Sequence, residues 1–142
     1  MAQVSFELQK YTILEGGVYG PGLDNDSDVE LIECAVGNEA NPPWDKDGTG
    51  ERAPWLMFKI KVTLNTGEEV FLRDYVGATE GNKLRKKLLA IGAPFNQDEN
   101  TGACSFDTDE VEGRKLRGIE VQRPRETEDG RVFNGRIKTY LG

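Results

Sequence analysis

Aromatic and cationic side chains alternate with apolar ones in a segment that has the pattern of a β-strand. Between residues 55 and 64 every even position is apolar, and Trp55, Lys59 and Lys61 occupy odd positions between them. Successive side chains of a strand point to opposite faces, so one face is predicted to be buried while the other carries rings and ammonium groups. Rings that stack on bases and cations that contact phosphates are what a single-stranded nucleic acid requires.

Two further segments are expected to extend this face. Alternation over 69–76 and over 131–141, with Ile137 and Leu141 inward, predicts a second set of outward residues. That set is Phe71, Arg73, Tyr75, Arg136, Lys138 and Tyr140. The pattern leaves one alternative open, in which Phe71 and Tyr75 belong to the core and Lys59 and Lys61 are ordinary solvated positions.

Several enzymatic and metal-binding chemistries are excluded by composition. The chain has no histidine, which removes Ser-His-Asp triads, Cys-His dyads and histidine-ligated zinc. Cys34 and Cys104 alone cannot form a closed zinc site, and we interpret them as small buried hydrophobes in a reducing compartment. The glycines at 16–20 match no phosphate-binding motif. We therefore expect no catalytic residue, no metal ligand and no cofactor.

The acidic segment 45–50 resembles the first half of an EF-hand loop. Position 12 of that loop would be Leu56 instead of the required glutamate, and the segment 24–28 lacks both the glycine and the glutamate. A true EF-hand is therefore rejected. A loose calcium site in a surface-binding β-domain stays as a third interpretation of the function.

Charge is unevenly divided along the chain. Residues 1–82 hold 6 basic and 15 acidic side chains, and residues 83–142 hold 12 basic and 10 acidic ones, which gives net charges of -9 and +2 and a total of -7. An acidic protein needs a local basic surface to bind a polyanion, and the second half could supply one. The acidic first half favours an alternative function, a structural or protein-interaction β-domain of a virion or regulatory kind.

The elements that position these residues are five strands and one helix in a single domain spanning 1–142. Strands are predicted at 29–36, 55–64, 69–76, 114–125 and 131–141, with a further strand near the N-terminus left open. The helix is predicted at 80–91, with Thr79 as N-cap, Gly92 and Pro94 as stop signals, and Lys83, Arg85, Lys86 and Lys87 on its solvated faces.

A helix between the third and fourth of five strands is the order of an OB-type β-barrel. Long polar loops are expected at 37–53 and 95–110, and Trp44 in the first of them could close over a bound strand. The chain contains no apolar run long enough to span a membrane, and residues 1–10 lack the features of a signal peptide. We expect a cytoplasmic protein.

Four segments within residues 54–141 form a recognisable set, namely the hydrophobic strand 55–64, the basic helix 82–92, the strand 112–121 and the hairpin segment 133–138. Together they resemble a family of small phage and prophage proteins that are considered OB-like single-stranded-DNA-binding proteins. The resemblance implies non-catalytic DNA binding in phage replication or recombination. It also implies replication or recombination proteins as further partners, and the host cytoplasm as location.

Overall fold

The alternating segment at the centre of the chain forms β3 (Trp55–Leu64), a central strand of a seven-stranded mixed sheet. The computed structural model describes residues 12–37, 55–77, 81–101 and 104–142. The other strands of this sheet are β1 (Gly17–Gly20), β2 (Asn25–Gly37), β4 (Glu69–Gly77), β7 (Lys115–Leu116), β8 (Gly118–Val121) and β11 (Ile137–Leu141).

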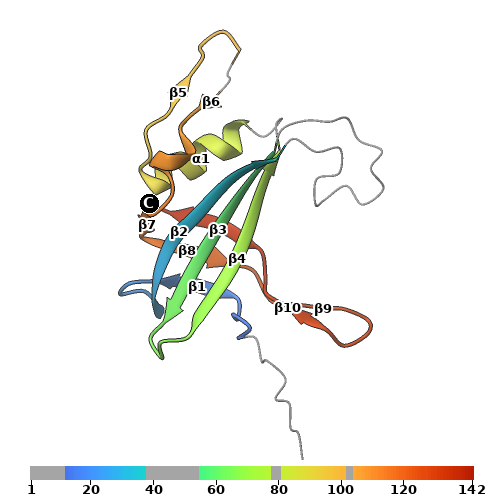
Figure 1. The fold of residues 1–142 in the computed structure, drawn as a ribbon. Coiled ribbons are helices and arrows are strands. Elements are labelled where there is room, and N and C mark those ends of the chain that lie inside the picture. Colours follow the sequence, from blue (N-terminus) through green and yellow to red (C-terminus); the bar gives the residue numbers. More distant parts are fainter. Residues whose placement is uncertain (1–11, 38–54, 78–80, 102–103) are drawn as a thin grey trace, which may run out of the picture.

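Strands β2, β3 and β4 form a long antiparallel meander, and β1, β8 and β11 cross it (Figure 1). The strand order is β11-β8-β1-β2-β3-β4, with β7 also paired to β2 and with β1 parallel to β2. The further strand left open near the N-terminus is β1, which pairs with β2 on one side and with β8 on the other. A mainly β fold with one helix after the third long strand is confirmed.

The sheet differs from the expected five-stranded barrel. Within the described ranges, β4 and β11 end the strand order and have no backbone pairing with each other, so the sheet is not a closed barrel. β2 begins at Asn25, four residues before the predicted start at 29, because Ser27 is already buried like Val29. The predicted strand 114–125 is divided into β7 and β8, since its first part pairs with β2 and its second with β1 and β11.

Two hairpins project from the body in different directions (Figure 1). One is formed by β9 (Arg125–Glu126) and β10 (Val132–Phe133), around the turn predicted at 126–130. The other is formed by β5 (Asn96–Gln97) and β6 (Cys104–Ser105), and the 3-10 helix η1 (Thr108–Glu110) follows it. Both β5–β6 and η1 fall in a segment that was expected to be a loop.

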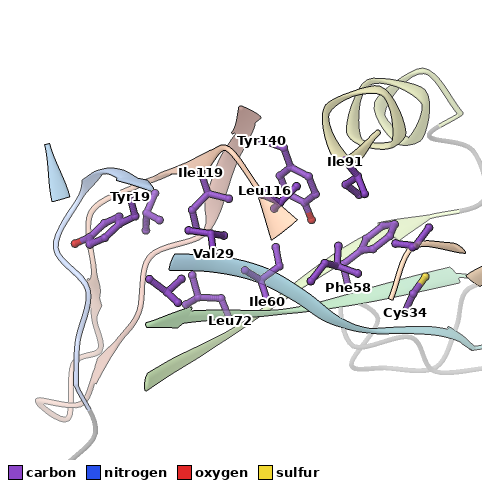
Figure 2. Packing of buried hydrophobic residues seen from close by; sticks show 14 of the residues in the cluster. Tyr19, Val29, Cys34, Phe58, Ile60, Leu72, Ile91, Leu116, Ile119 and Tyr140 are labelled. Carbon is purple, nitrogen blue, oxygen red and sulfur yellow. The ribbon is translucent and has the colours of Figure 1, made fainter. Parts of the chain in front are cut away.

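The core lies between the meander and the strands that cross it. The middle inward residues of β3, Phe58, Ile60 and Val62, are fully buried, as their alternation predicts, while Leu56 and Leu64 at its two ends are partly buried. The inward residues of β3 meet residues of β7, β8 and β11 (Figure 2). The central members of this core are Phe58, Ile60, Val62, Leu31, Val29, Leu116, Ile119 and Tyr140. Burial of this apolar surface supplies the main driving force for folding.

Helix α1 (Gly81–Ile91) covers one end of this core. It buries Leu84, Leu88 and Ile91, the apolar stripe predicted from their spacing. It ends at Ile91, and the following Gly92 has a φ of 78°, the left-handed conformation that glycine adopts without strain. Ala93 N donates to Leu88 O at 3.2 Å across this end. The predicted start at 80 and the N-cap Thr79 lie outside the described residues.

A buried polar cluster joins α1 to both end strands of the sheet. Asp74 lies on the inner face of β4, opposite Phe58 of β3. Its carboxylate accepts hydrogen bonds from Lys87 Nζ of α1 and from the Tyr140 hydroxyl of β11, the latter at 2.6 Å. Lys87 Nζ also lies 4.3 Å from the centre of the Tyr140 ring. The prediction that Lys87 is on a solvated face is wrong, because Asp74 draws its ammonium group into the protein.

Removal of the Lys87 charge is expected to destabilise the fold strongly. Lys87 and Asp74 side chains are only 9% and 14% exposed, so Lys87→Met leaves a poorly solvated carboxylate without its cation. Breaking such a pair costs about 3–5 kcal/mol of unfolding free energy, measured by urea denaturation. The neighbouring Lys86→Met, at an exposed position, should change it by no more than about 0.5 kcal/mol. Equal decreases in the two variants would contradict this role of Lys87.

Candidate nucleic-acid interface

Six of the predicted site residues share the outer face of β3 and β4. In the antiparallel register Lys59 is opposite Arg73, Lys61 is opposite Phe71, and Trp55 is opposite Gly77. Val70, Leu72 and Val76, which lie on the inner face of β4, are buried, so the interpretation in which these residues point into the core is confirmed. The alternative with Phe71 and Tyr75 in the core is wrong. The outer-face set consists of Trp55, Lys59, Lys61, Phe71, Arg73 and Tyr75.

The aromatic rings of this face differ in exposure. Phe71 is 48% exposed, and Lys59 Nζ lies 5.2 Å from the centre of its ring. Trp55 and Tyr75 are half-buried and meet edge to face, with ring centres 5.9 Å apart. The indole of Trp55 lies over Gly37 of β2, where an added Cβ would come within 2.1 Å of it. The absence of a side chain at Gly37 therefore lets the indole lie close to the sheet.

Acidic residues of β2 limit the positive charge of the face. Glu30 is opposite Lys61, and their charged groups are 3.7 Å apart, while Glu33 is opposite Lys59. The charge of Lys61 is therefore largely compensated. Arg73, on β4 and one strand further from β2, is exposed. The side of the face formed by β4 is the one best suited to an anionic ligand.

The three predicted residues of β11 and its approach are not part of this arrangement. Tyr140 is 7% exposed and packs edge to face on Phe58, with ring centres 6.4 Å apart, so the expectation that it points outward is wrong. The cause is a β-bulge between Ile137 and Thr139, which places Tyr140 instead of Thr139 opposite the buried Ile119.

Arg136 and Lys138 are exposed as predicted, but Lys138 belongs to another surface. Its ammonium group lies 3.6 Å from Glu120 of β8. It lines a hollow together with lysines of α1, and none of the outer-face residues of β3 and β4 takes part in that hollow.

Sequence reasoning overlooked Asp74 and Lys87, although both carried a signal. Asp74 continues the inward alternation of Val70 and Leu72, which places a carboxylate on a core face. Lys87 follows Leu84 by three positions and precedes Ile91 by four, so it lies on the apolar stripe of α1. Each is an isolated charged residue at a core position. Their burial is explained by their pairing, because each charge compensates the other.

The remaining expectations concern Trp44 and its loop, the two cysteines, metal ligands and membrane-spanning segments. Trp44 and the segments 45–50 and 37–53 lie outside the described residues, apart from Gly37, which ends β2. Cys34 is a buried free thiol as expected, and Cys104 is a partly buried one. In the part of the chain that is described, no group of three or more Cys, Asp or Glu residues could hold a metal ion. No described helix is long and apolar enough to cross a membrane.

Comparison of the chain with protein-family models, with curated proteins and with solved structures gives no match.

Two buried groups in the core have raised pKa values. Burial, reinforced by the charge of Asp74, raises the pKa of the Tyr140 phenol well above its ordinary 10.0. Burial, reinforced by the charge of Glu112, raises the pKa of the Cys34 thiol from 9.0 to about 11. Both groups hold their protons more tightly in the folded protein than in the unfolded chain.

The fold should therefore lose stability at alkaline pH. Because the unfolded chain releases these protons first, the free energy of unfolding should fall above about pH 9 through Cys34 and above about pH 10 through Tyr140. Tyr140→Phe should flatten the decline above pH 10 and leave the part between pH 9 and 10. Urea denaturation across this pH range measures both. A decline unchanged in Tyr140→Phe would exclude Tyr140 as its source.

Proposed function

We propose that this protein binds single-stranded nucleic acid without catalysis, through the outer face of β3 and β4. The observation that carries the proposal is the exposed Phe71 ring with Lys59 beside it, on the same face as Arg73 and the Trp55–Tyr75 pair. The buried inner face of the same two strands holds this surface rigidly, so little ordering is needed on binding.

The spacing along β4 suits a strand of several nucleotides. Phe71 and Tyr75 are four residues apart on one face, which places them about 13 Å from each other with Arg73 between them. Bases stacked on the two rings would each contribute about 1–3 kcal/mol, and the guanidinium of Arg73 would contact a phosphate between them. A base on Phe71 would displace the ammonium of Lys59 from the ring and leave it to a neighbouring phosphate.

The order of the elements supports an OB-type fold for this function. β2, β3, β4, α1, β7–β8 and β11 follow one another as the five strands and helix of that plan, and an OB-fold is a partly open barrel that uses the face of its second and third strands to bind oligonucleotides. Here those strands are β3 and β4. The resemblance to phage proteins extends the proposal to DNA, in replication or recombination within the host cytoplasm, with proteins of those processes as further partners.

A protein-interaction domain is the second candidate, and one observation favours it. Asp28, Glu30 and Glu33 follow the face of β2 beside the proposed interface, and a basic protein could replace the partners Lys115 and Lys61 that lie 3.4 Å from Asp28 and 3.7 Å from Glu30. The two functions separate experimentally, since nucleic-acid binding weakens steeply with salt and a protein partner survives nuclease treatment in a pull-down.

The exposed phenylalanines offer a matched test of the interface. Phe71 on β4 and Phe133 on the β9–β10 hairpin are 48% and 45% exposed. Phe71→Ala should weaken binding of an oligothymidylate between about 5-fold and 100-fold because a base can no longer stack there, with an unchanged melting temperature. Phe133→Ala should have little effect. Titration with tryptophan fluorescence at low and moderate salt measures the affinity.

Replacement of Trp55 and Lys59 by alanine completes the test. Both variants should bind the oligonucleotide more weakly. Lys59→Ala should melt close to the original temperature, whereas Trp55→Ala also removes the packing of the half-buried indole on Gly37 and Tyr75 and should melt lower. A parallel decrease in binding and stability of Lys59→Ala would show that this residue is structural. An unquenched fluorescence signal at low salt, where phosphate contacts are strongest, would reject nucleic-acid binding and favour the protein-interaction domain.

A further inference from the structure

A lysine-lined hollow of about 350 Å³ lies between α1 and β11, away from the proposed stacking face. It is formed by Lys83, Lys86, Lys87, Lys138, Thr139 and Tyr140. Four of its six lining residues are cations, in a protein whose net charge is -7. Such a concentration of like charge in a concave surface is unfavourable without a counter-charge, and it attracts anions.

The packing of α1 brings these lysines together. Because Leu84, Leu88 and Ile91 face the core, the flank of α1 that carries Lys83 and Lys86 is turned towards β11. The end of β11 lies against this helix, since a Cβ on Gly142 would come within 3.0 Å of the Ala90 Cα. Lys138 enters from β11 at the bulge, and the wall is completed by the buried Tyr140.

Among the described residues, two carboxylates are paired with the four lysines of the hollow. Asp74 is already engaged by Lys87 and by Tyr140. Glu120 is 3.6 Å from Lys138, in a pair that is about half exposed and therefore weak. Lys83 lies in the first turn of α1, near the positive end of the helix dipole, and the described part of that turn has no acidic residue. An anion in the hollow would relieve both kinds of repulsion.

A second hollow continues from the first. It has a volume of about 520 Å³ and shares Lys138 with the first, and its other lining residues include Glu120, Gln122 and Arg123. Cations are therefore distributed along a path from α1, past β11, to the base of the β9–β10 hairpin. Exposed aromatic rings are absent from the residues that line this path, so it offers contacts to phosphates and none of the stacking found on β3 and β4.

We use the name lysine groove for the hollow between α1 and β11. We propose that the lysine groove holds the phosphate backbone of the same single-stranded nucleic acid, independently of its bases. This inference rests on the proposed function, and it adds a second site where Lys83, Lys86 and Lys138 neutralise phosphates. Stacking on β3 and β4 and phosphate neutralisation in the groove then make separable contributions to one affinity. The groove increases affinity for any sequence, and its contribution is the one that salt removes.

Two adjacent residues of α1 give a matched test. Lys86 lines the groove and Arg85 does not, and both are exposed cations on the same helix. We would measure binding of a labelled oligothymidylate and of an abasic oligonucleotide of equal length by fluorescence polarisation. Lys86→Glu should weaken binding of both ligands about tenfold and reduce the salt slope by about 0.7 for each phosphate that is no longer neutralised. Arg85→Glu should weaken both by less than about threefold, and Lys83→Gln should follow Lys86→Glu.

The abasic ligand separates this inference from the proposed stacking face. Phe71→Ala should weaken binding of the oligothymidylate and leave binding of the abasic ligand unchanged. Equal effects of Lys86→Glu and Arg85→Glu would overturn the groove while leaving the stacking face intact. Binding of the abasic ligand that depends on Lys86, with no effect of Phe71→Ala, would support the groove and overturn the face. If polyglutamate displaces the labelled oligonucleotide more strongly than the abasic ligand does, the groove is not a phosphate site. That result would indicate that the groove binds an acidic protein segment.

Discussion

The carboxylate of Asp74 connects parts of the fold that backbone hydrogen bonds do not join. β4 and β11 are the two ends of the strand order, and α1 packs beside β7 and β11. Asp74 of β4 accepts hydrogen bonds from Tyr140 of β11 and from Lys87 of α1, so one buried group orients three elements. A buried charge is costly unless it is paired and hydrogen-bonded, and this requirement restricts how α1 and β11 can pack.

Both candidate surfaces follow from this restriction. With Asp74 inward, its neighbours Arg73 and Tyr75 point outward, which keeps their side chains on the face shared with Phe71. With Lys87 drawn inward, the adjoining turn of α1 lies beside β11, so Lys83 and Lys86 meet Lys138 across a hollow. β4 thus contributes to both surfaces. Its outward residues form part of the stacking face, and its Asp74 accepts hydrogen bonds from Lys87 and Tyr140, which line the groove.

The distribution of charge explains how an acidic chain could bind a polyanion. The excess of negative charge lies in residues 1–82, and in the described part of that half Glu30 and Glu33 compensate lysines on β3. Basic residues of the second half gather on α1 and β11, where Lys87 is paired with Asp74 and Lys138 with Glu120. Long-range repulsion and short-range attraction then act together, and such binding depends strongly on ionic strength.

Strands with unbroken periodicity, and the faces they present, could be predicted from the sequence. Strict alternation predicted β3 to the residue and the inward side of β4, and the spacing of Leu84, Leu88 and Ile91 predicted α1, because local periodicity reports which side of an element is buried.

The interruptions of that periodicity and the pairing of the strands depend on tertiary contacts. The bulge that turns Tyr140 inward, the division of residues 114–125 between β7 and β8, and the burial of Lys87 against Asp74 all arise from partners far away in the chain. No pattern within one segment contains the position of a partner in another, so these features came from packing alone.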